Sequence, residues 1–299
     1  MSTTLRIAAA QYPVSAPGAW SAVEDQLSAW VAKAAGAGAQ LLVFPEYAAL
    51  SLAALLPPAV RADLQAQLHA LQELHADYLA LHSRLAQRHG VHLLAGSYPV
   101  QVDGQFRNRA HLFAPSGASG WQDKWTMTRF ETEQWGIRAG DALKVFDTAL
   151  GRIGINICYD VEFPLLARAQ IEAGATMILA PSCTDTVAGY WRVRVGAQAR
   201  ALESQCVVIQ APLVGEAPWS PAVDVNVGAA GVYTPPDRGL PDDGLLALGA
   251  WNRAQWLYAD LDPARLQAVR DDGQVFNHRD WARQPGLGPR PSVQIEVLR

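Results

Sequence analysis

The strongest constraint on the fold of this chain is the alternation of short apolar runs with longer stretches of helical periodicity. Buried strands are predicted at 6–11, 41–44, 91–97, 108–114, 152–157, 176–180, 206–211, 228–233 and 256–260. Helices are predicted at 59–89, 164–174 and 190–204, and a first helix is expected to begin at a capping box formed by Ser21 and Glu24. Strands that alternate with helices in this way are typical of an α/β layered domain.

Composition favours one large folded domain. Of the 299 residues, 50% are hydrophobic and 17% are charged, which is enough apolar material for a large core and excludes general disorder. We expect a single domain over residues 1–275, because no linker rich in Gly, Ser or Pro divides it. Residues 276–299 hold Pro285, Pro289 and Pro291 and are predicted to form an extended C-terminal tail, a candidate oligomer contact.

Charge and cysteine content exclude several classes of function. The net charge is −4 and no basic run is present, which argues against nucleic acid or an anionic membrane as a partner. The most apolar window, 41–60, is interrupted by Glu46 and three prolines, so no membrane-spanning helix is expected. Cys158, Cys183 and Cys206 are odd in number and lack metal-ligand spacing, which indicates a protein of the reducing cytoplasm without a disulfide framework.

Three unusual residues lie at or near the ends of predicted strands. Glu46 follows an apolar strand, and a carboxylate in such a place is costly to bury unless it is hydrogen-bonded or functional. Cys158 ends another apolar strand, at a turn where backbone N–H groups can face the same point as the thiol. Lys124 lies between two tryptophans. Taken singly, these residues could equally be a loop glutamate, a small core cysteine and a surface lysine.

Taken together, the three residues and their neighbours resemble the signatures of the nitrilase superfamily of carbon–nitrogen hydrolases. The matching segments are Phe-Pro-Glu-Tyr around Glu46, Asp-Lys at Lys124 and Asn-Ile-Cys-Tyr-Asp-Val-Glu-Phe-Pro around Cys158, in the order and spacing of the family. The resemblance extends over most of the chain, from residue 8 to about residue 262. Three further segments look like a branch that is sometimes fused to an acetyltransferase domain, an addition not expected in this chain: 127–131, 181–186 and 189–194.

This resemblance implies a four-layer α-β-β-α sandwich and a catalytic triad of Glu46, Lys124 and Cys158. It also implies a second, supporting glutamate between the lysine and the cysteine. Counting back from the Gly-Asp pair that follows places this residue at Glu133, with Glu131, two residues away, as the alternative.

The chemistry of these side chains supports a thiol hydrolase independently of the resemblance. A free thiol is mostly protonated at neutral pH, so Cys158 needs a base, and Glu46 can take its proton. Lys124 can stabilise the thiolate and the oxyanion that forms when the thiol attacks a carbonyl, with the backbone N–H of Tyr159 as a second donor. Glu46 can then protonate the departing ammonia and later activate water. No metal or other cofactor is required.

The walls of the substrate pocket are predicted from their positions beside these motifs. The predicted wall residues are Tyr47, Trp125, Tyr159, Glu162, Cys183, Trp191 and Arg192. Many relatives carry arginine at the position of Glu162, so a specificity for acidic substrates does not transfer simply to this chain. His75, His82 and His89 recur every seven residues on one predicted helix, whereas a metal pair on a helix needs a spacing of about three or four, so no metal site is expected.

These observations predict an amidase-like enzyme that cleaves a small non-peptide amide through a thioester on Cys158 and releases ammonia. Hydrolysis of an N-carbamoyl amino acid or amine, or of a nitrile through a thioimidate, would use the same triad and stays open as an alternative. A catalytically silent ligand-binding scaffold is the rival from another class, although the presence of all three triad residues argues against it. The family resemblance further predicts a homodimer or larger assembly.

Overall fold

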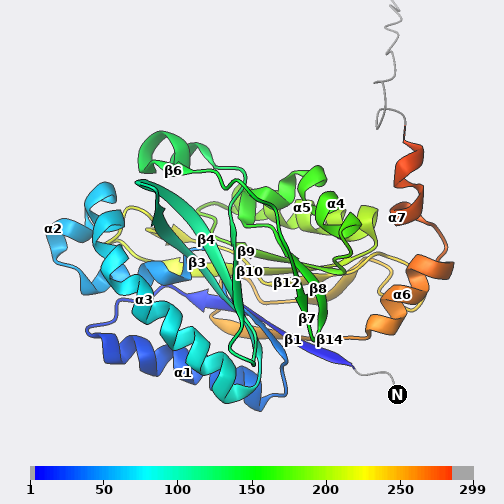
Figure 1. Cartoon of the computed structure of the whole chain (residues 1–299), viewed down its shortest axis with the longest axis horizontal. Coiled ribbons are helices and arrows are strands. Elements are labelled where there is room, and N and C mark those ends of the chain that lie inside the picture. Colours follow the sequence, from blue (N-terminus) through cyan, green and yellow to red (C-terminus); the bar gives the residue numbers. More distant parts are fainter. Residues whose placement is uncertain (1–3, 285–299) are drawn as a thin grey trace, which may run out of the picture.

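Strands, singly or in groups, are separated by helices along the chain in a computed structural model that describes residues 4–284 (Figure 1). The strands are β1 (Leu5–Pro13), β2 (Leu41–Val43), β3 (His92–Val102), β4 (Gln105–Phe113), β5 (Ser119–Asp123), β6 (Ile137–Arg138), β7 (Val145–Thr148), β8 (Gly151–Ile155), β9 (Met177–Ser182), β10 (Val207–Glu216), β11 (Val225–Asn226), β12 (Gly231–Tyr233), β13 (Leu245–Leu248) and β14 (Gln255–Leu261). The α-helices are α1 (Trp20–Gly36), α2 (Pro58–Arg61), α3 (Leu64–His89), α4 (Pro164–Glu172), α5 (Val187–Ser204), α6 (Pro263–Asp272) and α7 (Asn277–Asp280). Shorter helical turns are η1 (Ala48–Leu55), η2 (Glu131–Trp135), η3 (Cys158–Glu162) and η4 (Trp281–Arg283).

The strands form two sheets of similar order that meet at β1 and β10. The first sheet runs β14-β1-β2-β3-β4-β5, with β6 beside β4, and the second runs β13-β12-β10-β9-β8-β7, with β11 beside β10. They join where Tyr12 and Pro13 pair in parallel with Leu213 and Val214. Each sheet therefore keeps its own hydrogen-bonded ladder, and within residues 4–284 only the ends of two strands connect the two ladders.

Both faces of the first sheet are buried. Successive residues of a strand point to opposite faces, and in β1 Ile7 packs in one apolar cluster and Ala8 in the other. The cluster of Ile7 includes Ile155 and Val208 of the second sheet, whereas the cluster of Ala8 includes residues of α1 and α3 such as Val31. On the far side, α4 and α5 cover the second sheet (Figure 1). The predicted α-β-β-α sandwich, a single α/β domain, is confirmed.

The starts of two helices differ from the predictions. The long helix predicted at 59–89 is divided into α2 and α3, because the carboxylate of Asp63 caps α3 by accepting hydrogen bonds from two backbone N–H groups of its first turn, at 3.0 and 2.7 Å. The first helix begins one residue before Ser21, and no capping box forms. Glu24 instead pairs with Arg84 of α3 at 3.1 Å. Within residues 4–284, no helix combines the length and apolarity needed to cross a membrane.

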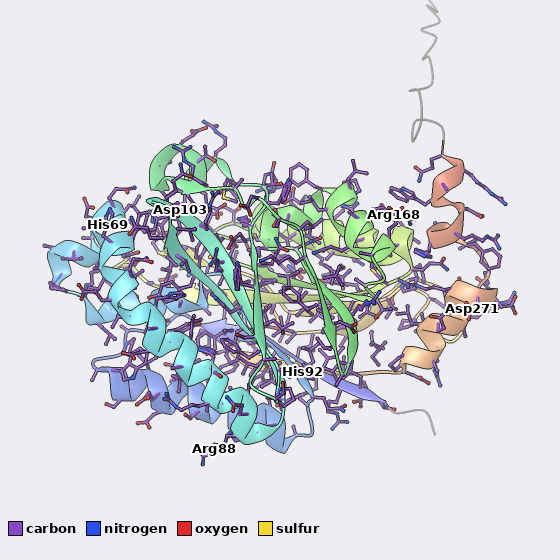
Figure 2. All side chains as sticks on the ribbon, in the orientation of Figure 1. His69, Arg88, His92, Asp103, Arg168 and Asp271 are labelled. Atoms are coloured by element: carbon purple, nitrogen blue, oxygen red, sulfur yellow. The ribbon has the colours of Figure 1, made fainter. Side chains whose placement is uncertain are left out.

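The described part of the C-terminal tail is helical and packs on the domain, so the prediction of an extended tail is wrong for α7 and η4. Arg168 of α4, labelled in Figure 2, donates a hydrogen bond to the carbonyl of His278 at 3.1 Å and lies over the ring of Trp281. The backbone N–H of His278 donates to Gln205 at 3.0 Å. The three prolines of the predicted tail lie outside the described residues.

Candidate active site

Four reactive or ionisable side chains follow strand ends of the two sheets. Glu46 follows β2 and Lys124 follows β5 in the first sheet, while Cys158 follows β8 and Cys183 follows β9 in the second. All four residues are buried or nearly so. Because neither sheet carries the complete set, the site exists only when the two sheets are packed together.

The turn that carries Glu46 is held against β3. The carbonyl of Pro45 approaches Gly96 so closely that a Cβ there would lie 2.1 Å from its oxygen, and Gly96 has a φ of +75°. The hydroxyl of Ser97 accepts a hydrogen bond from the N–H of Tyr47 at 2.9 Å. Tyr47 itself has a φ of 56°, a left-handed conformation that costs a non-glycine residue about 1–2 kcal/mol. The neighbouring strand thus fixes the position of the Glu46 carboxylate.

Lys124 lies between two carboxylates. Its side chain is 1% exposed, and its Nζ donates to Oε1 of Glu46 at 2.8 Å and to Oε2 of Glu131 at 2.7 Å. Its backbone is held by hydrogen bonds to Asn108 and Gly140, both 2.8 Å. A buried ammonium is tolerated only with such partners, because its desolvation is costly. The geometry brings Glu46 and Lys124 together, as the resemblance implied.

The second glutamate at Lys124 is Glu131, and the prediction of Glu133 is wrong. Both residues belong to the helical turn η2, but two positions along a helix point to different sides. Glu131 faces inward and is buried, whereas the side chain of Glu133 is 52% exposed and forms a two-fold hydrogen bond with Arg129, at 2.8 and 3.0 Å. Glu131 is the alternative that the sequence allows, because spacing alone does not tell which side of the turn is buried.

Glu46 and Glu131 differ in the number of hydrogen bonds that they accept. Glu131 accepts from Tyr47 at 2.7 Å, from the N–H and hydroxyl of Thr128 at 2.9 and 3.0 Å, and from Asn108 at 3.1 Å, in addition to Lys124. Glu46 accepts from Asn108 at 2.9 Å and from Lys124. Asn108 was missed by the sequence analysis. The only signal for it was an amide within an otherwise apolar and basic strand.

This difference separates the proton affinities of the two carboxylates. Burial raises the pKa of Glu46 and outweighs the opposing charge of Lys124. Burial would also raise the pKa of Glu131, but the charge and hydrogen bonds of Lys124, aided by Thr128 and Tyr47, outweigh it and the pKa is lowered. The charges of both glutamates likewise overcome burial and raise the pKa of Lys124. Glu131 and Lys124 therefore stay ionised, and Glu46 is the group suited to exchange a proton.

Cys158 opens the turn η3 in a left-handed conformation, with a φ of 50°. The residue is 4% exposed, and its Sγ donates to the carbonyl of Cys183 at 3.7 Å. Burial raises the pKa of this thiol, and the charge of Glu46 adds to the effect while that of Lys124 opposes it. The thiol also interacts with the carboxylate of Glu46. A protonated thiol beside a carboxylate of raised pKa is an arrangement for proton transfer.

Asp160 connects the turn of Cys158 to the segment that follows Lys124. Its buried carboxylate accepts hydrogen bonds from the N–H of Ile157 at 3.2 Å, of Trp125 at 3.1 Å and of Thr126 at 2.7 Å. Burial raises its pKa to about 7, against the opposing effects of Lys124 and these N–H groups. Since Ile157 and Trp125 adjoin Cys158 and Lys124, Asp160 fixes the segments of these two residues relative to each other. The sequence analysis did not single it out.

A cavity of about 750 Å³ opens at this group, a volume that suits a small molecule. Its wall includes the predicted residues Tyr47, Tyr159, Glu162, Cys183 and Arg192 together with Glu46, Lys124 and Glu131. Further wall residues that sequence reasoning missed come from two segments and one strand end: Met127, Thr128, Arg129, Phe130, Trp135, Asp185 and 221–226.

Two predicted wall residues lie elsewhere. Trp125 is exposed and does not line the cavity, because its backbone turns toward Asp160. Trp191 is also exposed, beside Arg194 on α5, where it lines a neighbouring surface groove. Sequence proximity to a motif does not determine where a side chain points.

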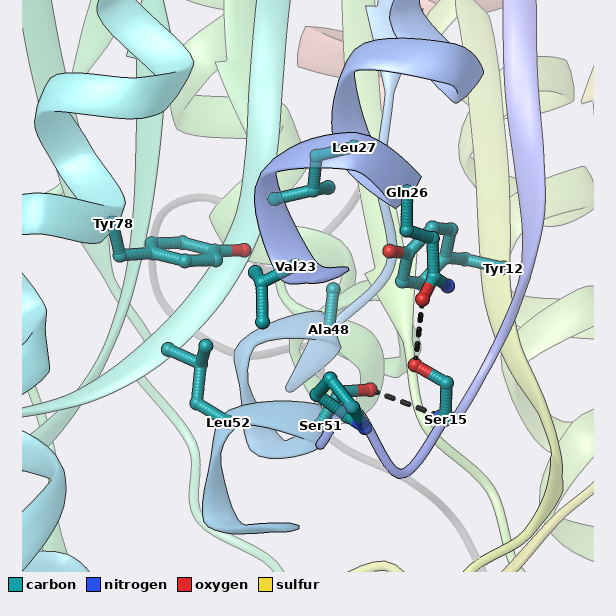
Figure 3. Close-up of a pocket in the computed structure, with 10 residues that line it drawn as sticks. Tyr12, Ser15, Val23, Gln26, Leu27, Ala48, Ser51, Leu52 and Tyr78 are labelled. Carbon is teal, nitrogen blue, oxygen red and sulfur yellow. Dashed lines mark hydrogen bonds between the residues drawn. The ribbon is translucent and has the colours of Figure 1, made fainter. Parts of the chain in front are cut away.

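A second, much smaller cavity lies between α1 and η1 (Figure 3). It has a volume of about 10 Å³, room for about one water molecule. In its wall, the hydroxyl of Ser15 donates a hydrogen bond to Gln26 at 2.9 Å, and the backbone N–H of Ser15 donates to the hydroxyl of Ser51 at 3.1 Å. No substrate fits there.

Each histidine of α3 is either packed against other side chains or exposed to solvent. Nδ1 of His82 lies 2.8 Å from the carbonyl of Tyr78, inside the apolar layer between α3 and the first sheet. His69 and Arg88 mark the two ends of α3 in Figure 2. Over the part of the chain that the structure describes, no group of three or more His, Cys, Asp or Glu side chains is placed to hold a metal ion.

Comparison with known proteins identifies the family. The family described as Carbon-nitrogen hydrolase matches residues 6–271, which include every residue of the group around Lys124 and Cys158. This chain belongs to the carbon–nitrogen hydrolase family.

Individual members of the carbon–nitrogen hydrolase family are similar to this chain over different lengths. "Probable hydrolase YhcX" of Bacillus subtilis is 33% identical over 279 residues, which cover 93% of this chain and 54% of that protein. "Omega-amidase NIT2-B" of Xenopus laevis is 28% identical over 149 residues, which cover 47% of this chain and 54% of that protein. The chain thus spans about half the length of these two curated relatives.

The fold is shared with solved members of the nitrilase superfamily. Saccharomyces cerevisiae Nit3, described as a member of branch 10 of that superfamily, superposes with a TM-score of 0.72 at 20% identity, covering 93% of this chain and 97% of Nit3. The family match confirms the carbon–nitrogen hydrolase resemblance that the three motifs indicated, and the likeness to Nit3 adds that the fold is shared.

Proposed function

We propose that this chain hydrolyses a small non-peptide amide through a thioester on Cys158, with release of ammonia. The observation that carries the proposal is the buried Lys124, held between two carboxylates of unequal proton affinity beside a buried thiol, at the wall of a cavity of about 750 Å³. The family membership and the amidase names of several relatives support it.

In the first half-reaction Glu46 accepts the thiol proton as Sγ of Cys158 forms a bond to the amide carbon, and the carbonyl electron pair moves onto oxygen. Lys124 Nζ and the N–H of Tyr159 stabilise the resulting oxyanion. When the carbonyl re-forms, the C–N bond breaks, and Glu46 donates its proton to the nitrogen, which leaves as ammonia. The acyl group remains on Cys158 as a thioester.

In the second half-reaction a water molecule replaces ammonia. Glu46 accepts a proton from the water as its oxygen bonds to the thioester carbon. The C–S bond then breaks, the proton returns to the sulfur of Cys158, and a carboxylic acid leaves. The sum is one amide and one water converted to one acid and one ammonia.

Glu131 has a different role from Glu46. Its lowered pKa keeps it ionised, and it holds Lys124 protonated and directed at the reacting carbonyl throughout the cycle. A single carboxylate could not both exchange protons and keep the lysine charged.

Ammonia release from a panel of primary amides, N-carbamoyl amino acids and nitriles tests the proposal. It also distinguishes amide hydrolysis from the hydrolysis of N-carbamoyl compounds or nitriles. Cys158→Ala is expected to reduce release to background while circular dichroism and thermal unfolding stay close to wild type. Cys206→Ala, a core cysteine at the start of β10 that is outside the cavity, is the matched control and keeps activity. Full activity in Cys158→Ala would contradict the mechanism.

Silence of the wild-type protein across the whole panel would favour the catalytically silent scaffold. Alkylation of Cys158 by iodoacetamide then tests whether the thiol is activated at all. The homodimer or larger assembly and the cytoplasmic location expected from the sequence stay predictions, and sedimentation velocity of the purified chain would check the first.

A further inference from the structure

The cavity carries an excess of carboxylates beyond the group at Lys124. Three acidic side chains line its outer part, Glu162, Asp185 and Asp224, whereas two basic ones do so, Arg129 and Arg192. The balance of charge on this wall decides which substituent of an amide is attracted and which is repelled.

Neither arginine offers a free cation deep in the cavity. Arg129 donates from Nε and Nη2 to Glu133, which lies outside the cavity wall. Arg192 reaches Glu162 only at 3.9 Å, with 62% of its side chain exposed. An exposed pair at this distance is weak and screened by salt, so a better-placed cation can replace Arg192.

Of the three outer carboxylates, Glu162 lies nearest to Cys158 in the chain. It ends the turn η3 that Cys158 opens, four residues earlier, and its side chain is only 21% exposed. The backbone of this turn is fixed, because a Cβ on Gly196 of α5 would lie 3.0 Å from the carbonyl of Val161, and Arg200 donates to that same carbonyl at 2.9 Å. The backbone that carries Glu162 is therefore held in place, and most of its side chain is shielded from solvent.

We propose that the amide substrate carries a cationic group, an ammonium or a guanidinium, that is received by Glu162. This inference rests on the hydrolase function proposed above and names its substrate class. Asp185 and Asp224 at the rim add a field of the same sign. An amide that carries a carboxylate meets repulsion from the same three side chains and is the poorest substrate.

Three linear primary amides of similar length test the proposal through kcat/KM: 4-aminobutanamide (cationic), pentanamide (neutral) and succinamate (anionic). We expect the cationic amide to exceed the neutral one by at least about fivefold, as for a charged hydrogen bond in a half-buried site, with succinamate last. Glu162→Gln is expected to bring the cationic-to-neutral ratio of kcat/KM close to one, mainly by raising KM for the cationic amide. Asp147→Asn, an exposed carboxylate on β7, is the matched control and preserves the preference.

A second measurement probes the electrostatic potential of the cavity through the labelling rate of Cys158 and does not depend on turnover. Cys158 is labelled with a cationic or an anionic reagent, 2-(trimethylammonio)ethyl or 2-sulfonatoethyl methanethiosulfonate. Each rate is divided by the rate with 2-mercaptoethanol, and Cys158→Ala gives the background from the other cysteines. The cationic-to-anionic ratio is expected to exceed one and to fall in Glu162→Gln but not in Asp147→Asn.

The two measurements separate the two proposals. Hydrolysis of all three amides without preference for the cation, or an unchanged labelling ratio in Glu162→Gln, overturns the role of Glu162 while the hydrolase function stands. If no amide is hydrolysed but the labelling ratio falls in Glu162→Gln, the hydrolase function fails and the cation preference of the cavity stands.

Discussion

Two glutamates of one helical turn, Glu131 and Glu133, have opposite surroundings. Glu131 is buried, binds the ammonium of Lys124 and accepts hydrogen bonds from three other residues, whereas Glu133 pairs with Arg129 in solvent. Both are carboxylates at short distance from a cation. The two glutamates differ in desolvation. The cost of burying the charge of Glu131 is offset only by its partners, and the cost of burying the charge of Lys124 is offset in turn by Glu131.

The largest effect is expected when that buried carboxylate loses its charge. Glu131→Gln leaves Lys124 with one carboxylate, and we expect a loss of at least about 100-fold in kcat and of about 3 kcal/mol in the free energy of unfolding, as for a broken buried ion pair. Glu133→Gln is the matched control and should leave both values unchanged. Ammonia release and urea unfolding measure the two quantities. Equal effects of the two variants would remove the distinction between the buried and the exposed glutamate.

A smaller effect is expected at Asp160, the buried carboxylate that holds backbone instead of a cation. In Asp160→Asn one of the accepting oxygens is replaced by an NH₂ group that faces N–H donors, which should cost about 2 kcal/mol in the free energy of unfolding. Because the segments of Cys158 and Lys124 are then less well aligned, kcat should fall at least about tenfold while KM changes less. Asp77→Asn on the exposed face of α3 serves as the control. A lower stability with unchanged kcat would make Asp160 purely structural.

The third prediction extends the comparison to histidine and concerns the pH dependence of stability, with no effect on activity. Burial lowers the pKa of His82 to about 4, so as the pH falls below about 6.5 the unfolded chain takes up a proton that folded His82 refuses until about pH 4. This residue therefore removes up to about 3 kcal/mol of the free energy of unfolding between pH 6.5 and 4. Asp160, with its raised pKa, acts in the opposite direction over the same range.

The contribution of His82 to the pH dependence of stability is obtained by comparing the wild type with variants. Urea unfolding of the wild type, of His82→Leu and of His89→Gln from pH 7 to 4 should give a flatter profile for His82→Leu alone. Parallel profiles for all three proteins would mean that His82 is charged in the folded state.

The sequence predicted the layered fold because apolar runs and helical periodicity persist over many residues. Short strands such as β6 and β11, each of two residues, leave no such pattern and were missed. Likewise the capping role of Asp63 was not visible, because an acidic residue within a helical pattern is usually only an exposed position.

For the site, the motifs predicted Glu46, Lys124 and Cys158, which the structure brings together. They did not predict which of Glu131 and Glu133 turns inward, nor that Trp125 and Trp191 turn away. Those outcomes depend on contacts between segments far apart in the chain, such as Asp160 with Trp125.

The division of the site between two sheets has a consequence for how activity appears during folding. Glu46 and Lys124 belong to one sheet and Cys158 to the other, and the ladders of the two sheets connect only at the ends of β1 and β10. Either sheet can form its own hydrogen bonds without bringing Cys158 to Glu46 and Lys124, and docking requires contacts between residues distant in sequence, which form slowly. Enzymatic activity regained after dilution from denaturant would therefore report the docking of the sheets, later than the return of secondary structure.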